Sequence, residues 1–195
     1  MEKIKYIALL RGINVGGKNI IKMNELKTVF EELKFIEVKT YIQSGNIIFT
    51  DTDKDKTKLT EIIQKALFEK FNYDCPIRIY NFNEYQNIIN NIPKGFGMEK
   101  EKYKYDVWFL INPLTAEEVM KSVRLRDGVD KMYKGSGVVY TSRLIEMLGK
   151  SYFSKTVQLP MYKNITIRNW NTTQRIVELM EEQCNENKEH SKQTK

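Results

Sequence analysis

The chain has 195 residues, of which 41% are hydrophobic and 29% are charged, and its net charge is +7. These values are ordinary for one folded domain or two small ones, and they argue against wholesale disorder. No apolar run reaches the roughly 18–20 residues of a membrane span, and the N-terminus lacks the cleavage site of a signal peptide. Cys75 and Cys184 have no metal-ligand spacing, so we expect a cytoplasmic protein without a membrane partner.

The first half of the chain alternates apolar segments of strand and helix periodicity. The expected elements are a strand over residues 4–13, a helix over 23–33, strands over 37–41 and 46–50, a helix from an Asp55 N-cap to Asn72, and a strand over 76–80. This β-α-β-β-α-β order is that of a ferredoxin-like unit.

The second half repeats much of this pattern. The expected elements are a helix over 84–90, strands over 105–112, 137–141 and 165–168, helices over 115–123 and 144–153, and a C-terminal helix from Asn171. Residues 105–112 parallel Tyr6–Asn14 in ending on Ile-Asn, and residues 137–141 parallel 46–50 in residue type. We therefore predict an α+β fold of duplicated ferredoxin-like halves, 1–82 and 105–170, with a helix and connector over 83–104 and a C-terminal helix with a polar tail over 171–195.

A polar glycine loop, RGINVGGK (Arg11–Lys18), follows the first strand and has no counterpart in the second half. The first and third strands of a ferredoxin-like sheet are antiparallel neighbours, so this loop should lie beside the start of the third strand. Glycines allow close approach to a ligand, successive N–H groups can bind an anion, and arginine has a fork geometry suited to carboxylate or phosphate. The candidate ligand-binding residues are Arg11, Gly12, Asn14, Gly16, Gly17 and Lys18 in the loop, with Gln43, Ser44, Gly45 and Asn46 opposite.

We predict a site there for a small anionic or nucleotide-like ligand. In the alternative reading, the asparagines only satisfy turn backbone and Arg11 makes a structural salt bridge. The loop matches G-x-x-x-x-G-K, but Asn19 stands where a phosphate loop needs Ser or Thr and no helix starts at once. The single histidine, His190, lies in the polar tail, which excludes histidine bases, catalytic triads and His-ligated zinc. The sequence assigns no catalytic residue, metal, cofactor or oligomeric state. An enzyme that acts without histidine stays an open alternative.

A second hypothesis is nucleic-acid binding through a basic stretch, in which eleven Lys and Arg stand against three acids between Lys121 and Arg175. A solvated basic face is the alternative. Residues 134–141 partly match an RNA-recognition pattern, but Ser136, Val138 and Thr141 replace the aromatic residues that would stack on bases. A third hypothesis is a protein-interaction module.

Three segments, LLRGINVGGKN (Leu9–Asn19), TYIQSGNIIF (Thr40–Phe49) and TIRNWNT (Thr166–Thr172), resemble the signature blocks of a bacterial family, the domain of unknown function 1697 family. The resemblance spans almost the whole chain and implies two ferredoxin-like halves plus a C-terminal helix, with no known activity. It also implies that Arg168, Asn169, Trp170 and Asn171 belong with the candidate ligand-binding residues, without implying one shared pocket. Ile167 departs from the family pattern, in which we expect threonine at this position.

Overall fold

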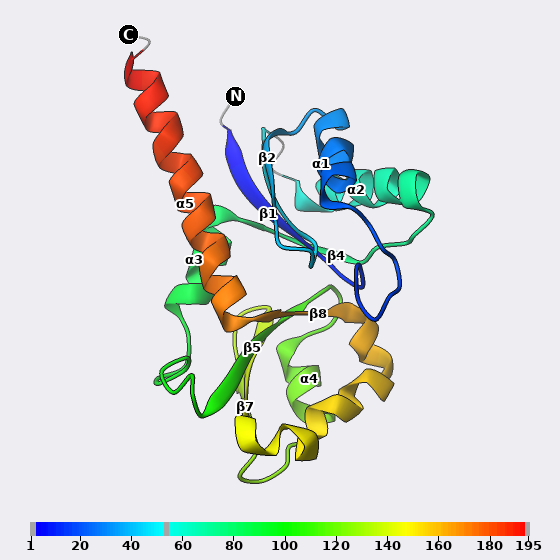
Figure 1. Cartoon of the computed structure of the whole chain (residues 1–195), viewed down its shortest axis with the longest axis vertical. Helices are drawn as coiled ribbons and strands as arrows, with labels where there is room; N and C mark the ends of the chain where they lie inside the picture. Colours follow the sequence, from blue (N-terminus) through cyan, green and yellow to red (C-terminus); the bar gives the residue numbers. More distant parts are fainter. Residues whose placement is uncertain (1–2, 53–54, 194–195) are drawn as a thin grey trace. The chain divides into compact units, whose positions relative to one another are not determined.

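The computed structural model describes the backbone of residues 3–52 and 55–193, with side chains to Glu182 in the last helix. It is an α+β protein with two four-stranded antiparallel sheets, ordered β2-β3-β1-β4 and β6-β7-β5-β8 (Figure 1). The identical strand order confirms the predicted duplication of a ferredoxin-like unit. Residue contacts divide the chain into two units, one that ends at Gln86 and resumes at Thr172, and one over Asn87–Asn171. The exact domain boundaries expected from the sequence stay a prediction.

The first unit follows the predicted element order. Its elements are β1 (Ile4–Leu10), α1 (Met23–Glu32), β2 (Ile36–Tyr41), β3 (Asn46–Asp51), α2 (Lys56–Phe71) and β4 (Ile77–Asn81), followed by α3 (Phe82–Asn90) and, from Thr172, by α5 (Trp170–Gln193). Tyr85 of α3 packs edge-on against Tyr80 with ring centroids 6.1 Å apart, and its hydroxyl donates to the Thr173 carbonyl of α5.

Hydrophobic periodicity places α1 and α2 on one face of the first sheet. Leu26 and Phe30 of α1 and Leu67 of α2 pack with Ala8 and Phe49 of the strands in one buried cluster. Alternate strand residues point to this face, as the period of a strand requires. The core therefore fixes the register of β1 against β3, which positions the chain segments at the end of the sheet.

The boundaries of α2 confirm two signals in the sequence. The Asp55 side chain accepts hydrogen bonds from the N–H groups of Thr57 and Lys58, and it is the N-cap. Asn72 ends the helix in the left-handed conformation, with φ +51°. Both residues do what their side-chain and backbone chemistry favours at helix ends.

The second unit differs from the first in its second helix. Its elements are β5 (Tyr103–Leu110), α4 (Ala116–Ser122), β6 (Asp130–Lys134), β7 (Val138–Leu144), the short 3-10 helices η1 (Ile145–Lys150), η2 (Tyr152–Gln158) and η3 (Pro160–Asn164), and β8 (Ile165–Asn169). Trp108 is buried and meets Phe153 of η2 edge-on at 5.1 Å between ring centroids.

Three sequence-based expectations for the second half were wrong in detail. The strand β6 was not predicted, because its lysine-rich sequence suits an edge strand rather than a buried one. The helix expected over 144–153 is replaced by 3-10 turns, with a non-helical Met147 and a Ser151 side chain that accepts from the Phe153 N–H. The helix α5 begins at Trp170 rather than Asn171, because the Asn169 side chain accepts from the Asn171 N–H. A polar tail is also predicted to begin at Gln183, and its side chains lie outside the described ones.

In the structure, the two repeats align one residue away from the alignment predicted from the sequence, in which residues 137–141 match residues 46–50. The Leu10 N–H donates to the Gly45 carbonyl in the first sheet, and the Leu110 N–H donates to the Gly137 carbonyl in the second. Gly137 is thus equivalent to Gly45 and not to Asn46. A one-residue slip would exchange the two faces of a strand, and only the observed alignment keeps Ile47 and Val139 on the helix-covered faces.

The capping box of α4 leads to a prediction about pH. The Thr115 hydroxyl accepts from the Glu118 N–H, and the Glu118 carboxylate accepts from the Thr115 N–H. The hydrogen bonds from Thr115, first from its hydroxyl and then from its backbone, lower the pKa of Glu118 below 4.5. The stabilisation is therefore present above that pH and lost as the pH falls through the lower, folded-state pKa.

We expect Thr115→Ala to lower the free energy of unfolding by about 1 kcal/mol. Glu118→Gln should destabilise the protein in urea unfolding at neutral pH, and by less at a pH acidic enough to protonate the wild-type carboxyl group, because the carboxylate is then absent from both proteins. An equal destabilisation at both pH values would contradict this assignment.

Candidate functional site

The structure brings the two predicted loop segments together at one end of the first sheet. The Leu10 N–H donates to the Gly45 carbonyl at 2.8 Å, and β1 and β3 pair in register from Ile4 with Asp51 to Leu9 with Asn46. On the other side of β1 the Arg11 N–H donates to the Pro76 carbonyl at 2.9 Å. Residues 11–18 thus leave the sheet between two fixed neighbours.

The glycine loop is a small, exposed hairpin. The Asn14 N–H donates to the Asn19 carbonyl at 3.0 Å, and the Lys18 N–H donates to the Val15 carbonyl at 3.1 Å. Gly16 and Gly17 at its tip have φ +59° and +73°, as a two-residue type I′ turn requires. Among the described residues, the N–H groups of Gly16 and Gly17 have no protein acceptor. The tip is therefore open to a ligand from solvent.

Two asparagine side chains hold this hairpin, and a third holds the segment opposite it. The Asn14 amide donates to the carbonyls of Ile21 and Gln43, each at 3.0 Å, and its oxygen accepts from the Ile21 N–H at 2.8 Å. The Asn19 amide donates to the Gly12 carbonyl at 2.9 Å. The buried Asn46 amide donates to the Tyr41 carbonyl and the Ser44 hydroxyl. These amides have structural partners, so the tip N–H groups and the exposed Lys18 are the groups of the loop that face solvent.

Arg11 and Lys18 supply the positive charge of the loop. Arg11 is half-buried and Lys18 is exposed. The Tyr73 hydroxyl donates to the Arg11 carbonyl at 3.0 Å, which fixes the backbone at the start of the loop. Burial raises the pKa of Tyr73, while the nearby Arg11 charge acts in the opposite direction. Tyr73 therefore keeps its proton, and this hydrogen bond, at neutral pH.

Two further glycines are required where the loop passes its neighbours. A Cβ on Gly12 would lie 2.5 Å from the Tyr73 hydroxyl oxygen, and one on Gly45 would lie 2.8 Å from the Leu10 Cβ. Both residues also have φ above +70°. Gly12 and Gly45 thus permit close packing at the base of the loop, whereas Gly16 and Gly17 are surrounded by open space.

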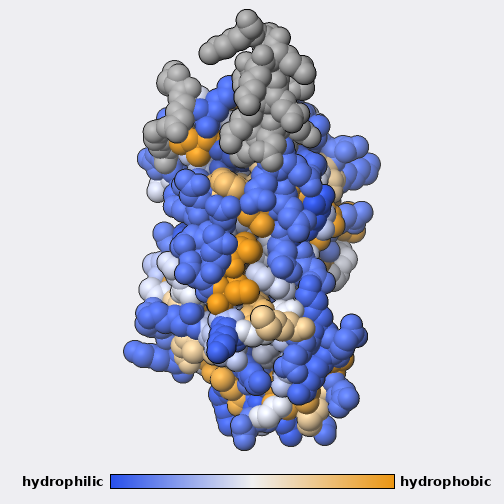
Figure 2. All heavy atoms as spheres, turned by 90° about the vertical axis from the view of Figure 1, so that its left-hand side faces the viewer, coloured by the Kyte–Doolittle hydropathy of each residue, from blue (hydrophilic) through white to orange (hydrophobic). Residues whose placement is uncertain are grey.

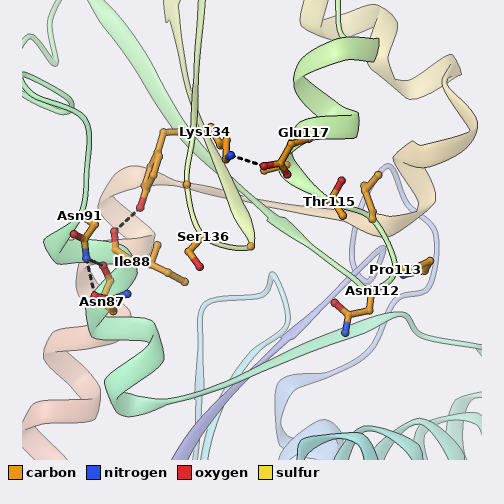
Figure 3. Close-up of a pocket in the computed structure, with 14 residues that line it drawn as sticks. Asn87, Ile88, Asn91, Asn112, Pro113, Thr115, Glu117, Lys134 and Ser136 are labelled. Carbon is orange, nitrogen blue, oxygen red and sulfur yellow. Dashed lines mark hydrogen bonds and ion pairs between the residues drawn. The ribbon is translucent and has the colours of Figure 1, made fainter.

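The corresponding end of the second sheet carries a hollow instead of a hairpin. The Leu110 N–H donates to Gly137 and the Ile111 N–H to Asn164, as Leu10 and Arg11 do in the first sheet. Only residues 111–115 connect β5 to α4, whereas residues 11–22 connect β1 to α1. A hollow of about 880 Å³ opens at this end (Figure 3). Its lining comprises Asn87, Ile88, Asn91, Asn112, Pro113, Leu114, Thr115, Ala116, Glu117, Lys134, Gly135, Ser136, Gly137 and Tyr140.

The hollow is polar and internally paired. Lys134 and Glu117 form an ion pair on one side of it, and this hydrogen bond lowers the pKa of Glu117 (Figure 3). The Asn91 amide donates to the carbonyl and the side-chain oxygen of Asn87. Tyr140, the only aromatic residue of segment 134–141, is buried and donates its hydroxyl proton to the Ile88 carbonyl at 2.7 Å. Its ring is unavailable for stacking on a base.

The segment Arg168–Asn171 belongs to the second unit. Arg168 is buried, and its guanidinium donates to the Thr166 hydroxyl and the Ile167 carbonyl. The Asn169 amide donates to the Tyr105 carbonyl. Trp170 is buried edge-on against Phe96, with ring centroids 5.3 Å apart. Asn169, Trp170 and Asn171 also line a separate hollow of about 300 Å³.

The basic stretch forms one cluster that sequence reasoning missed. Arg124, Arg126 and Lys155 all approach the ring of Tyr152, with their charged groups 5.6, 5.6 and 4.6 Å from the ring centroid. The sequence signal was present in the net charge of the stretch, but nothing in the spacing indicates that residues 124–126 meet residues 152–155.

Comparisons with known proteins are consistent with the fold. Residues 4–140 match the model of a family described as "Protein of unknown function (DUF1697)". The chain is also similar to the solved structure of the conserved bacterial protein SP0830 from Streptococcus pneumoniae. The identity is 28%, the TM-score is 0.80, and the match covers 91% of this chain and 98% of the other. No curated protein matches the chain. Within the described residues, no helix has both the length and the apolar character needed to cross a bilayer.

Proposed function

The chain belongs to the DUF1697 family of proteins of unknown function, and we propose that it binds a small anionic or nucleotide-like ligand at the glycine loop Arg11–Lys18. The observation that carries the proposal is the concentration of left-handed backbone in this loop. Five of the eight residues from Gly12 to Asn19 have positive φ, and two of the five are asparagines rather than glycines. Glycine adopts this backbone freely, but a residue with a side chain keeps it only where its surroundings hold it, and such residues cluster at ligand-binding and catalytic sites.

The segment opposite the loop supports the proposal. Ile42 has φ +48° although it is β-branched, and Gly45 has φ +71°. A β-branched residue in the left-handed region is a genuine outlier. Asn14 links this segment to the loop through the Gln43 carbonyl. Two unusual backbone segments joined by one side chain make a preorganised surface, and preorganisation reduces the entropy lost on binding.

The chemistry of the loop favours an anion over a cation or an apolar ligand. Its tip offers the N–H groups of Gly16 and Gly17, and successive backbone N–H groups in a turn can form an anion-binding concavity. Lys18 and Arg11 add two positive charges, and no acidic residue occurs between Arg11 and Asn24. Asn14, Asn19, Ser44 and Asn46 act as the frame of the site in this proposal.

The hollow beside Lys134 is a second candidate position for a ligand. Its volume of about 880 Å³ lies in the range of small-molecule sites, about 300–1,000 Å³. It occupies the end of the second sheet that is equivalent to the loop end of the first. A polar ligand in this hollow would replace part of the contact between Lys134 and Glu117 with contacts of its own.

The protein-interaction hypothesis has less support. Hydrophilic residues cover most of the face drawn in Figure 2, and hydrophobic residues show only in small areas of it. That face therefore lacks the broad apolar patch that marks many protein-binding surfaces.

Thermal unfolding in the presence of small anions tests the proposal. We expect phosphate, tripolyphosphate, citrate or a mononucleotide to raise the Tm of the wild type, because a ligand at 100 times its Kd adds about 2.7 kcal/mol of stability. Lys18→Ala and Arg11→Gln should reduce the shift strongly. Lys22→Ala, which removes the same charge four residues from Lys18 and outside the hairpin, should leave it unchanged.

Two outcomes would redirect or end the proposal. A shift that survives both loop variants but disappears in Lys134→Ala would move the site to the hollow in the second unit. If none of the anions shifts the Tm of the wild type, the loop does not bind a small anion.

A further inference from the structure

The geometry points to a second anion site, at the ring of Tyr152, that binds phosphate groups, whether of a single-stranded nucleic acid or of a small phosphate compound. It lies in the second unit and does not depend on the proposed function of the glycine loop. We call Arg124, Arg126, Tyr152 and Lys155 the Tyr152 cluster. Its three cations have charged groups within 5.6 Å of one ring centroid.

The charges of the Tyr152 cluster are not neutralised within the protein. Among the described residues, none of Arg124, Arg126 and Lys155 has a carboxylate within ion-pair distance. Groups this close to a shared centroid repel one another, since screening acts over a Debye length of about 8–10 Å. The ring attracts each cation only modestly at an exposed site. An anion with more than one charged oxygen would relieve the repulsion.

A buried carboxylate holds the cluster together. Asp130 accepts hydrogen bonds from the Arg126 N–H and the Tyr152 N–H, both at 2.9 Å, and from the Ser151 hydroxyl at 2.5 Å. These contacts tie the chain at 126 to the chain at 152. Asp130 is only 6% exposed and its oxygens are occupied by these donors, so it positions the cations rather than pairing with their charged ends. These bonds fix the backbone at Arg126 and Tyr152 before any ligand arrives, which favours binding.

A small hollow beside the ring has the size and chemistry for a phosphate group. Its volume is about 160 Å³, and Arg124, Lys155 and Tyr152 line it. The space equals that of about five water molecules at ~30 Å³ each. Ser122, Thr156 and Gln158 contribute polar side chains to the same lining, and no acidic residue does. Arginine and lysine are the residues that bind phosphate through charge-assisted hydrogen bonds.

A second tyrosine in the same unit carries two cations that both have side-chain partners in the protein. Lys102 and Lys131 approach the ring of Tyr103 at 5.4 and 4.7 Å. There Lys102 pairs with Glu99 at 3.6 Å, and Lys131 donates to the Tyr103 hydroxyl, which raises the pKa of Lys131. The Tyr103 pair therefore offers a matched control, with two cations on one ring but with protein partners.

The test measures binding of a fluorescent single-stranded oligonucleotide by anisotropy and of tripolyphosphate by calorimetry, over a series of salt concentrations. We expect the double variant Arg124→Gln/Lys155→Gln to lose about tenfold in affinity for the oligonucleotide at low salt. The slope of log K against log salt should shrink by about 1.4, since each phosphate contact on a single strand contributes about 0.7. The control double variant Lys102→Gln/Lys131→Gln removes the same charge and should retain both affinity and slope.

The two arms identify the source of the phosphate. Binding of the oligonucleotide with weak binding of tripolyphosphate indicates a nucleic-acid backbone, and the reverse indicates a small phosphate compound. Either result supports the site if Arg124→Gln/Lys155→Gln weakens that binding about tenfold. Equal losses in both double variants would show that only net charge matters and would overturn the proposal. So would a wild type that binds neither probe at low salt. Lys18→Ala, which tests the glycine loop, should leave binding at the Tyr152 cluster unchanged.

Discussion

Replacing Asn14 by alanine is expected to lower the free energy of unfolding by about 3 kcal/mol, a large effect for a half-exposed polar residue. The variant loses three hydrogen bonds, two to the carbonyls of Ile21 and Gln43 and one from the Ile21 N–H. Each such bond is worth about 1 kcal/mol. Alanine also tolerates the φ of +53° at this position less well than asparagine does. Urea unfolding with circular dichroism detection measures the change.

Two matched variants show how much of the lost stability comes from the hydrogen bonds of the Asn14 side chain. Asn14→Asp keeps the oxygen that accepts from Ile21 but loses both donated bonds, so we expect an intermediate loss. Asn19→Ala also removes a loop asparagine with positive φ, but the Asn19 amide donates to one backbone carbonyl, that of Gly12, and a smaller loss should result. If Asn14→Ala destabilises the protein no more than Asn19→Ala does, the hairpin is not held in the way described.

Gly45→Ala is the second substitution with a large expected effect, a loss of about 3 kcal/mol. The new Cβ would lie 2.8 Å from the Leu10 Cβ and 2.9 Å from the Ile13 Cδ1. Overpacking of this kind costs about 1–3 kcal/mol, and the φ of +71° adds roughly 1 kcal/mol for a residue with a side chain.

Gly17→Ala separates the two terms of that loss. Its φ of +73° is almost the same as that of Gly45, but a Cβ there would meet no atom within 4 Å. We therefore expect a loss of only about 1 kcal/mol for Gly17→Ala. Equal losses at the two glycines would mean that the contact with Leu10 relaxes without cost, and the close packing at the base of the loop would then not be limiting.

Much of the fold was predictable because local signals agreed with the global pattern. The Asp55 N-cap begins α2, the left-handed Asn72 ends it, and the Thr115–Glu118 capping box begins α4. Each of these helix boundaries follows a signal that is visible in the sequence. The duplication was also predictable from the recurring strand sequences. Its exact alignment was not, since Asn46–Thr50 and Gly137–Thr141 are alike in residue type, and only hydrogen bonding reveals that Gly137 matches Gly45.

The parts that could not be predicted depend on contacts between distant segments. The strand β6 is an exposed, lysine-rich edge, which composition does not distinguish from a loop. The 3-10 turns after Leu144 form where Asp130 accepts hydrogen bonds from the Ser151 hydroxyl and the Tyr152 N–H, twenty-one and twenty-two residues away. The same carboxylate links the chain at Arg126 to the chain at Tyr152. The Tyr152 cluster could therefore not have been found from the spacing of charges in the sequence.

The candidate site was predicted in position but not in the roles of its residues. The ferredoxin-like order of strands and helices placed the glycine loop beside residues 43–46. It could not show that the amides of Asn14 and Asn46 would bond to backbone carbonyls. Asparagine side chains that frame a turn and those that bind a ligand look the same in a sequence, because both follow glycine-rich segments.

The most direct measurement of the proposed function is an amide NMR titration of the wild-type protein with the small anions named above. The account predicts saturable shifts of the Gly16, Gly17 and Lys18 amide signals, with the Asn14 side-chain amide unchanged because its bonds to Ile21 and Gln43 persist. The same titration of Lys18→Ala should give much smaller shifts. Saturable shifts confined to residues outside Arg11–Lys18, or no saturable shifts with any of the anions, would contradict a ligand site at the glycine loop.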